Sequence, residues 1–385
     1  MRPYDNLDTW LLTATFDRNP EYLEAGQARD HESLNKLAEF LDGAPRKKAN
    51  MYDETGIWEF WQALPLREAA DLPRVQVLYY RVVERGGPGS NLVQEGLLGL
   101  ICATENPTSI PFWVEILDFK SPKKRDNFRQ QRRQFALAAL ARLAVRHDET
   151  SAYEALIQAT GHVDAAVREQ AVDYLGRCYQ INDRPLPLHL VEVLTNIASQ
   201  DDAFTPRIQA WAVLRWAGLP VPTTYPHMVY GFVVKFKWDK HIRRVIEIRS
   251  EQTLADLQAA IQQSIGWDND HLYTFYMSGD EDDRRFAINA PGYDGWSYAD
   301  DDYLSPANEV TIGELGLRTG DSFLYLFDYG DRHLFTVRLG ATTVMPPEEL
   351  RSRTYPRLVD SQGEAPPQYP DWDDDEIWEI DEGEI

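Results

Sequence analysis

The hydrophobic pattern divides the chain into two parts with different periods. Up to about residue 220, apolar residues recur every three to four positions, as in the segments 34–41 and 57–63. This spacing places apolar side chains on one face of an α-helix. Beyond about residue 228, apolar and polar residues alternate, which is typical of half-buried β-strands. The pattern therefore predicts an all-α N-terminal region followed by a region that contains a sheet.

A short motif recurs within the helical part, in which a small residue is followed four positions later by Leu. The small residues lie 40, 35 and 39 positions apart: Gly96, Ala136, Ala171 and Ala210. Such a period, with two helices per unit, is typical of α-solenoids of the HEAT type. An ordinary helical bundle is the alternative interpretation. We predict a HEAT-like α-helical repeat domain over residues 1–218, in which Asp164 caps the clearest repeat helix.

A proline-rich stretch follows, with three prolines between Leu219 and Pro226. It predicts a linker over residues 219–228. The pattern beyond it predicts two strands, a helix that starts at Thr253 and stops at Gly266, a third strand, a long loop, a short helix and a final pair of strands. This order matches a β-grasp fold with an added strand. We therefore predict an α+β, β-grasp-like domain over residues 229–370, and an acidic tail over residues 371–385.

The final pair of strands lies between Ser322 and Leu339. Apolar residues fill positions 323–327, so we expect both faces of the first strand to be covered. The second strand alternates Phe335, Val337 and Leu339 with polar residues. Between the strands Gly330 stands between two acids, where we expect a positive φ.

The chain is acidic, with a net charge of −23 from 62 acidic and 39 basic residues. The acidic tail carries nine acids, two tryptophans and no Lys or Arg. This charge repels nucleic acid and anionic membranes at long range. No apolar run is long enough to cross a bilayer, and the N-terminus lacks a signal-peptide pattern. We expect a cytoplasmic protein without a membrane partner.

Recognisable catalytic motifs are missing from the sequence. Glycine-rich segments lack the strand-before, helix-after context of a phosphate loop, and no nucleophile elbow occurs. Cys102 and Cys178 lie in apolar helical patterns and are predicted to be buried. We therefore assign no catalytic residue and no cofactor.

One basic stretch interrupts the acidic background between residues 123 and 133. Its six basic residues are candidates for an anion-binding site: Lys123, Lys124, Arg125, Arg129, Arg132 and Arg133. The alternatives are a solvated helix face or a binding site for the acidic tail.

Several ordered motifs resemble the plasmid pRiA4b ORF-3-like family over about residues 228–372. They include the strand 242–248, the helix 253–262, Gly266-Trp267 followed by His271-Leu272 and Phe275, the turn 327–331, and the proline-rich segment 355–369. The turn stands where the family has Tyr-Asp-Phe-Gly-Asp. Two departures are His333 in place of a Trp, and Ile242 in place of an aromatic residue. The resemblance implies a plasmid or mobile-element context and no established activity.

The turn and its surroundings form a candidate functional cluster. Its members are Asp328, Asp331, His333, His271, Trp267, Arg243 and Arg244. Carboxylate and imidazole groups at this spacing could bind a metal such as Mn, Zn or Fe. The structural alternative is that the acids bond turn amides, and that Asp331 pairs with Arg243, Arg244 or Arg332.

Three functions follow from these features. The first is a non-enzymatic interaction or scaffold protein that binds a protein or peptide partner. The second is a metal-dependent hydrolase or nuclease that uses the acid and histidine cluster. The third is a nucleic-acid-associated protein, which the net charge disfavours. The acidic tail could dock on a basic groove of this chain or of a partner. The sequence leaves the oligomeric state open.

Overall fold

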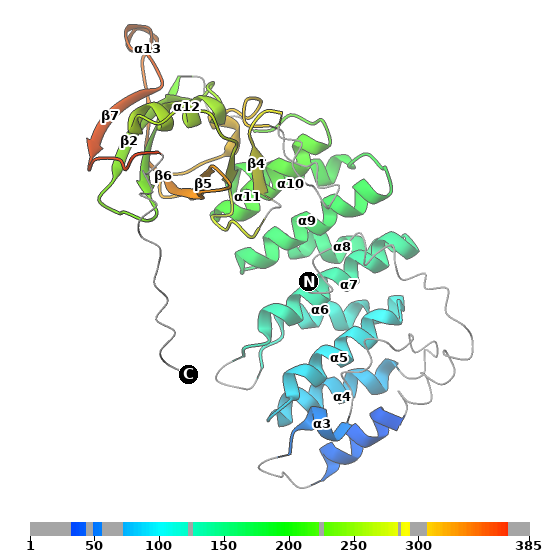
Figure 1. Cartoon of the computed structure of the whole chain (residues 1–385). Helices are drawn as coiled ribbons and strands as arrows, with labels where there is room; N and C mark the ends of the chain where they lie inside the picture. Colours follow the sequence, from blue (N-terminus) through cyan, green and yellow to red (C-terminus); the bar gives the residue numbers. More distant parts are fainter. Residues whose placement is uncertain are drawn as a thin grey trace, which may run out of the picture. The chain divides into compact units, whose positions relative to one another are not determined.

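The computed structural model describes residues 32–43, 49–55, 72–121, 126–222, 227–283, 286–292 and 306–368 (Figure 1). The chain forms two compact units, Met1–Ile197 and Ala198–Ile385, called unit 1 and unit 2.

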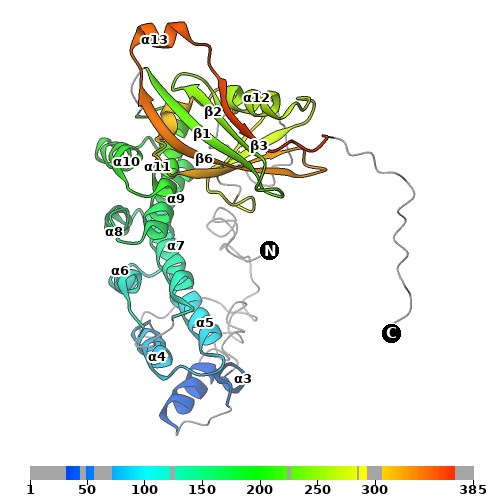
Figure 2. The same ribbon diagram turned by 90° about the vertical axis from the view of Figure 1, so that its left-hand side faces the viewer.

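The described residues of unit 1 are mainly helical, as their pattern predicted, and the predicted helical segment 57–63 lies outside the described residues. The helices of unit 1 are a segment at 32–42, α3 (Met51–Thr55), α4 (Leu72–Arg85), α5 (Ser90–Ala103), α6 (Ile110–Asp118), α7 (Arg129–His147), α8 (Thr150–Ala159), α9 (Ala165–Ile181) and the larger part of α10 (Leu188–Gln200). Helix α4 packs on α5, α6 on α7, and α8 on α9. In addition α7 packs on both α5 and α9, so α5, α7 and α9 form one row and α4, α6 and α8 a second (Figure 2).

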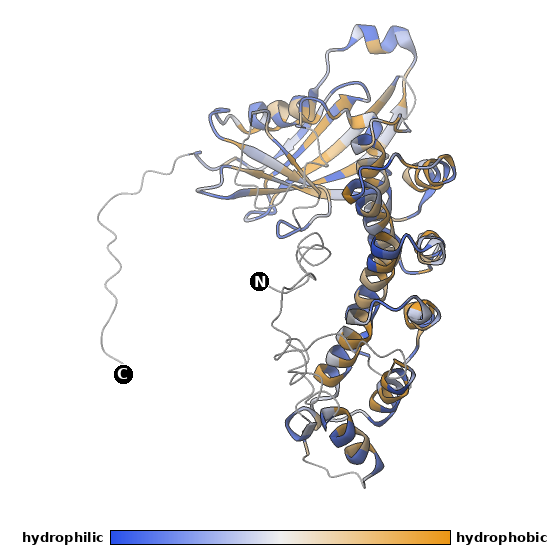
Figure 3. Cartoon of the chain, turned by 90° about the vertical axis from the view of Figure 1, so that its right-hand side faces the viewer, coloured by the Kyte–Doolittle hydropathy of each residue, from blue (hydrophilic) through white to orange (hydrophobic). Residues whose placement is uncertain are grey.

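Helix α9 shows how local sequence specifies these elements. The carboxylate of Asp164 accepts a hydrogen bond from the backbone N–H of Ala166 at 3.1 Å, which is the predicted N-cap. Val167, Ala171 and Leu175 follow at helical spacing and are buried. The helices accordingly carry apolar and polar residues side by side along their length (Figure 3).

Both cysteines are buried and free, as predicted. Burial raises the pKa of the Cys102 thiol to about 12 and also raises the pKa of Cys178. Both shifts favour the neutral thiol over the thiolate.

Unit 2 contains a seven-stranded sheet in which every neighbouring pair is antiparallel. The strands are β1 (Met228–Phe236), β2 (Arg243–Arg249), β3 (Tyr273–Tyr276), β4 (Ala287–Asn289), β5 (Ser322–Phe327), β6 (His333–Val344) and β7 (Arg357–Gln362). They lie in the order β4-β3-β5-β6-β1-β2-β7. The unit also contains α11 (Phe204–Trp216), α12 (Leu254–Ile265), η4 (Ile312–Leu315) and α13 (Pro347–Ser352).

One face of the sheet forms the core of unit 2. Alternate residues of β1, namely Tyr230, Phe232, Val234 and Phe236, are buried with Leu254, Leu257 and Ile261 of α12. Strand β5 is buried on both faces from Phe323 to Phe327, as predicted, because a second small cluster forms on the opposite face around Leu324 and Leu326.

Helix α11 belongs to unit 2, whereas the predicted helical domain extended to residue 218. Ile208 and Trp211 lie in the core cluster of unit 2. Arg207 forms an ion pair with Asp321, and Arg215 pairs with Glu314 at 2.9 Å. Helical periodicity identifies a helix but not the surface against which it packs.

Three further elements of unit 2 lay outside the sequence prediction: β4, α13 and β7. Strand β4 lies inside the predicted loop and has three residues, too few to show a period. Strand β7 is exposed along most of its length, including Leu358 and Val359. A strand without a buried face has no alternation to detect.

Of the predicted linker, residues 223–226 lie outside the described part. No helix within the described residues is long and apolar enough to cross a membrane.

Candidate functional site

The turn between β5 and β6, residues 328–332, is held together by Asp328. Its Oδ1 accepts hydrogen bonds from the backbone N–H groups of Gly330, at 2.8 Å, and Asp331, at 3.4 Å. Its own N–H donates to the carbonyl of Leu272 at 3.1 Å, and its carbonyl accepts from the N–H of Arg332 at 2.8 Å. The buried carboxylate thus accepts hydrogen bonds from the backbone of its own turn.

The expected positive φ at Gly330 is wrong. The left-handed residues of this turn are Asp328, at φ 57°, and Arg332, at φ 53°. Asp tolerates this conformation because its short side chain bonds the local backbone. Gly330 leaves room instead, since a Cβ at this position would lie 3.2 Å from Oδ1 of Asp328.

The acids and histidines of the candidate cluster do not form a metal centre. His271 Nε2 lies 3.5 Å from Asp328 Oδ2, but Asp331 is exposed. In the part of the chain that the structure describes, no group of three or more His, Cys, Asp or Glu side chains could hold a metal ion. The convergence that the hydrolase hypothesis requires is therefore absent from these residues.

His333 and Trp267 belong to the core rather than to an open site. Their ring centroids are 4.4 Å apart, and Trp267 also packs against Phe236, Phe327 and Phe335. Nε2 of His333 is buried without a hydrogen-bond partner. Burial lowers the pKa of His333, the carboxylates of Asp331 and Asp328 oppose this shift, and His271 adds to it.

Trp267 also anchors the closing segment, residues 363–368. Its Nε1 donates to the carbonyl of Pro366 at 2.8 Å. Two residues later, Oε1 of Gln368 accepts from the N–H of Asp268 at 2.6 Å, and Nε2 donates to Asp270 at 2.8 Å. These contacts hold the closing segment against residues 267–270.

The two arginines of the cluster have structural partners other than Asp331. Arg243 pairs with Asp360 of β7 at 2.5 Å. Arg244 is buried and donates to the carbonyls of Ser264, Arg243, Gln362 and Gly363. Arg332 pairs with Glu281 at 2.6 Å. Arg244 therefore ties α12, β2 and the closing segment together.

The basic stretch of unit 1 is only partly available to an anion. Lys123, Lys124 and Arg125 lie outside the described residues. Arg132 is 1% exposed, pairs with Asp126 at 2.8 Å and donates to Tyr79 Oη at 2.6 Å. Arg133 is buried too and pairs with Asp164 at 2.5 Å. Among the described residues of this stretch only Arg129 is an exposed base.

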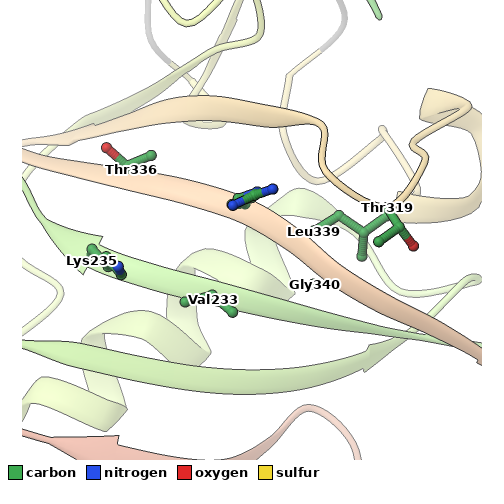
Figure 4. Close-up of a pocket in the computed structure, with 7 residues that line it drawn as sticks. Val233, Lys235, Thr319, Thr336, Leu339 and Gly340 are labelled. Carbon is green, nitrogen blue, oxygen red and sulfur yellow. The ribbon is translucent and has the colours of Figure 1, made fainter. Parts of the chain in front are cut away.

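A groove lies on the outer face of the sheet, defined as the face opposite α12. It has a volume of about 400 Å³ and is lined by Val233, Lys235, Thr319, Thr336, Arg338, Leu339 and Gly340. Val233 and Lys235 come from β1, and Thr336 from the neighbouring strand β6 (Figure 4). We call it the outer-face groove.

Two cations of the outer-face groove have no ion-pair partner among the described residues. Lys235 lies directly opposite Thr336, and Val233 lies opposite Arg338. Lys235 and Arg338 are therefore diagonal neighbours on one face of adjacent strands. Both are exposed, and no acid lines the groove. This arrangement can accept an anionic ligand.

Sequence reasoning missed this groove although one signal was present. Alternation places Val233 with Lys235 on one face of β1, and Thr336 with Arg338 on one face of β6. The sequence did not show that β1 and β6 are neighbouring strands. Their pairing places Val233 and Lys235 beside Thr336 and Arg338 on one surface.

Comparison with known proteins gives two findings. No curated protein matches the chain. The crystal structure of a protein of unknown function from Methanosarcina mazei Go1 matches with 23% identity and a TM-score of 0.30, covering 37% of this chain and 74% of that chain.

The match to a family model is confined to unit 2. It begins at the second residue of β1 and ends just beyond the closing segment. It includes the turn at 328–332, Trp267 and α12, which carry the motifs that the sequence shares with this family. Residues 229–370 match the model of the family described as plasmid pRiA4b ORF-3-like protein.

Proposed function

We propose that this protein is a non-enzymatic interaction protein whose unit 2 binds an acidic peptide segment of a protein partner in the outer-face groove. The observation that carries the proposal is the pair of cations, Lys235 and Arg338, which lack ion-pair partners among the described residues and line an open groove without acids.

The chemistry of the groove favours a peptide that is both acidic and apolar. Two neighbouring positive charges repel each other, so an anionic ligand relieves an unfavourable interaction as well as adding attractive ones. Val233 and the aliphatic stems of the two basic residues supply apolar surface. Because both charges are exposed, binding should weaken as salt is added.

Two features support an interaction role over catalysis. Among the candidate acids, Asp328 accepts hydrogen bonds from the backbone of its own turn and Asp331 is exposed, and the described residues contain no group of acids and histidines that could hold a metal ion. Both thiols have raised pKa values because they are buried. The nucleic-acid hypothesis loses support because Arg132 and Arg133 are paired with acids.

Unit 1 is proposed to supply a second surface as a HEAT-like solenoid. The pairing of successive helices and the row formed by α5, α7 and α9 support this assignment. For unit 2, the strand order supports a β-grasp-like fold with β6 inserted between β1 and β5. The family match supports an association with plasmids or other mobile elements.

A random peptide library selected against the full chain tests the function of the groove. We expect the enriched peptides to combine Asp or Glu with aromatic residues. We expect the double variant Lys235→Glu/Arg338→Glu to bind these peptides about tenfold more weakly or worse, measured by fluorescence anisotropy at low salt.

A matched control separates groove chemistry from net charge. Lys240 and Arg351 are exposed bases of unit 2 that do not line the groove. The double variant Lys240→Glu/Arg351→Glu carries the same change in charge and should bind like the unmodified protein. Equal loss in both double variants, or enrichment of peptides without acids, would contradict the proposal.

A further inference from the structure

We infer that the outer-face groove also binds the acidic tail of this same chain, residues 371–385, so that the tail competes with a partner for the groove. This inference rests on the proposed function of the groove and adds a ligand that the protein carries itself.

The composition of the tail fits the groove. Its nine acids and absence of Lys or Arg complement Lys235 and Arg338. Trp372 and Trp378 stand among these acids. An indole ring can lie against an Arg guanidinium or a Lys stem, which adds contact area and a cation–π interaction. The tail therefore combines negative charge with apolar surface, the two properties that we expect the groove to bind.

The position of Gln368, the last described residue, puts the tail within reach of the groove. Gln368 is held by Asp268 and Asp270, and its backbone is hydrogen-bonded to His333, the first residue of β6. Arg338 lies further along the same strand, about 17 Å from His333 at roughly 3.3 Å per residue. An extended chain covers about 13 Å from Gln368 to Trp372 and about 33 Å to Trp378. The acids between the two tryptophans can therefore reach the groove around the end of the sheet.

Attachment to the same chain strengthens such a contact. A tethered ligand acts at an effective concentration of about 1 mM when the linker is short and spans the sites. A weak contact between exposed charges can then be occupied most of the time, and an acidic peptide from a partner must displace the tail. The competing location is the basic stretch of unit 1, of which Arg129 is the exposed base within the described residues.

The test uses full-length protein and a labelled peptide with the sequence of residues 369–385. A variant of the full chain, called the tail-neutral variant, removes the four consecutive acids between the tryptophans and one tryptophan: Asp373→Asn, Asp374→Asn, Asp375→Asn, Glu376→Gln and Trp378→Ala. We expect the peptide to bind this variant about tenfold more tightly than the unmodified chain, because the groove is no longer occupied. Adding Lys235→Glu/Arg338→Glu to the tail-neutral variant should remove this binding, whereas adding Lys240→Glu/Arg351→Glu should not.

The outcomes separate this inference from the proposed function. Equal binding of the peptide to the unmodified and tail-neutral chains overturns the inference. Binding that is insensitive to the groove substitutions but lost with Arg129→Glu assigns the tail to unit 1 and overturns it too. If the tail peptide fails to bind while library-selected acidic peptides bind the groove, the inference fails and the proposed function stands. If no acidic peptide binds any form, both fail. Circular dichroism of each variant confirms that it is folded.

Discussion

The surroundings of His333 alter its protonation. The residue stacks on Trp267, and its Nε2 is buried without a hydrogen-bond partner. Burial disfavours the charged imidazolium and lowers its pKa below the ordinary value. The folded chain therefore takes up the proton of this residue at a lower pH than the unfolded chain does.

This difference predicts a pH dependence of stability. Below about pH 6.5 the unfolded chain binds a proton at His333 that the folded chain does not, so the free energy of unfolding falls as the pH falls toward the lowered pKa. Above this range the contribution is constant. We expect His333→Phe, which keeps an aromatic ring against Trp267, to reduce the slope of unfolding free energy against pH below about pH 6.5.

Urea unfolding at several pH values measures this slope. His241 is exposed, and His241→Gln serves as the control that should leave the slope unchanged. An identical slope in His333→Phe and in the unmodified protein would show that the buried imidazole has no role in it.

Helix α12 shows the interplay of sequence and packing at the scale of an element. Thr253 accepts a hydrogen bond from the N–H of Asp256 at 3.2 Å, and Asp256 accepts from the N–H of Thr253 at 2.8 Å. This capping box begins the helix, and Gly266 ends it in the left-handed conformation at φ 74°. Both ends were predicted from the sequence because these signals are local.

The cap allows a quantitative prediction. Thr253→Ala removes the acceptor for the Asp256 N–H and should cost about 1 kcal/mol of stability. Chemical denaturation followed by tryptophan fluorescence measures the loss. Thr319→Ala is the matched control, because Thr319 is exposed, lies in a turn and makes no side-chain hydrogen bond within the described structure. A loss of the same size in the control would contradict the role of the cap.

At the scale of the whole molecule, the boundary between the units follows packing rather than periodicity. Trp211 of α11 is 1% exposed and lies in the core of unit 2 with Ile208. Trp113 of α6 is equally buried but lies in unit 1, where its Nε1 donates to Ser109 at 3.1 Å. These two tryptophans report on different units.

We expect their substitution to destabilise different parts of the chain. Trp211→Ala should lower the unfolding transition of unit 2, and Trp113→Ala that of unit 1, each by about 3–5 kcal/mol for the affected unit. Differential scanning calorimetry of the full chain resolves which transition moves. If Trp211→Ala moves the same transition as Trp113→Ala, α11 stabilises unit 1 instead.

The sequence by itself determined the features that depend on neighbours along the chain. Helical and alternating periods separated the helices from the sheet, Asp164 and Thr253 marked helix starts, and the ordered motifs of residues 229–370 indicated the family. In each case the signal lies within a few residues, because caps, turns and amphipathic faces arise from local backbone geometry.

Tertiary structure decided which distant residues meet. In the folded chain Asp328 accepts hydrogen bonds from its own turn, and Arg243 pairs with Asp360. Arg132 and Arg133 are buried beside acids. Tertiary structure also assigned α11 to the sheet and brought Lys235 beside Arg338 by pairing β1 with β6. A pattern along the chain states which face of an element is apolar, but not which element covers that face, since covering is a property of two elements together. The candidate functional surface of this protein arises from such a pairing.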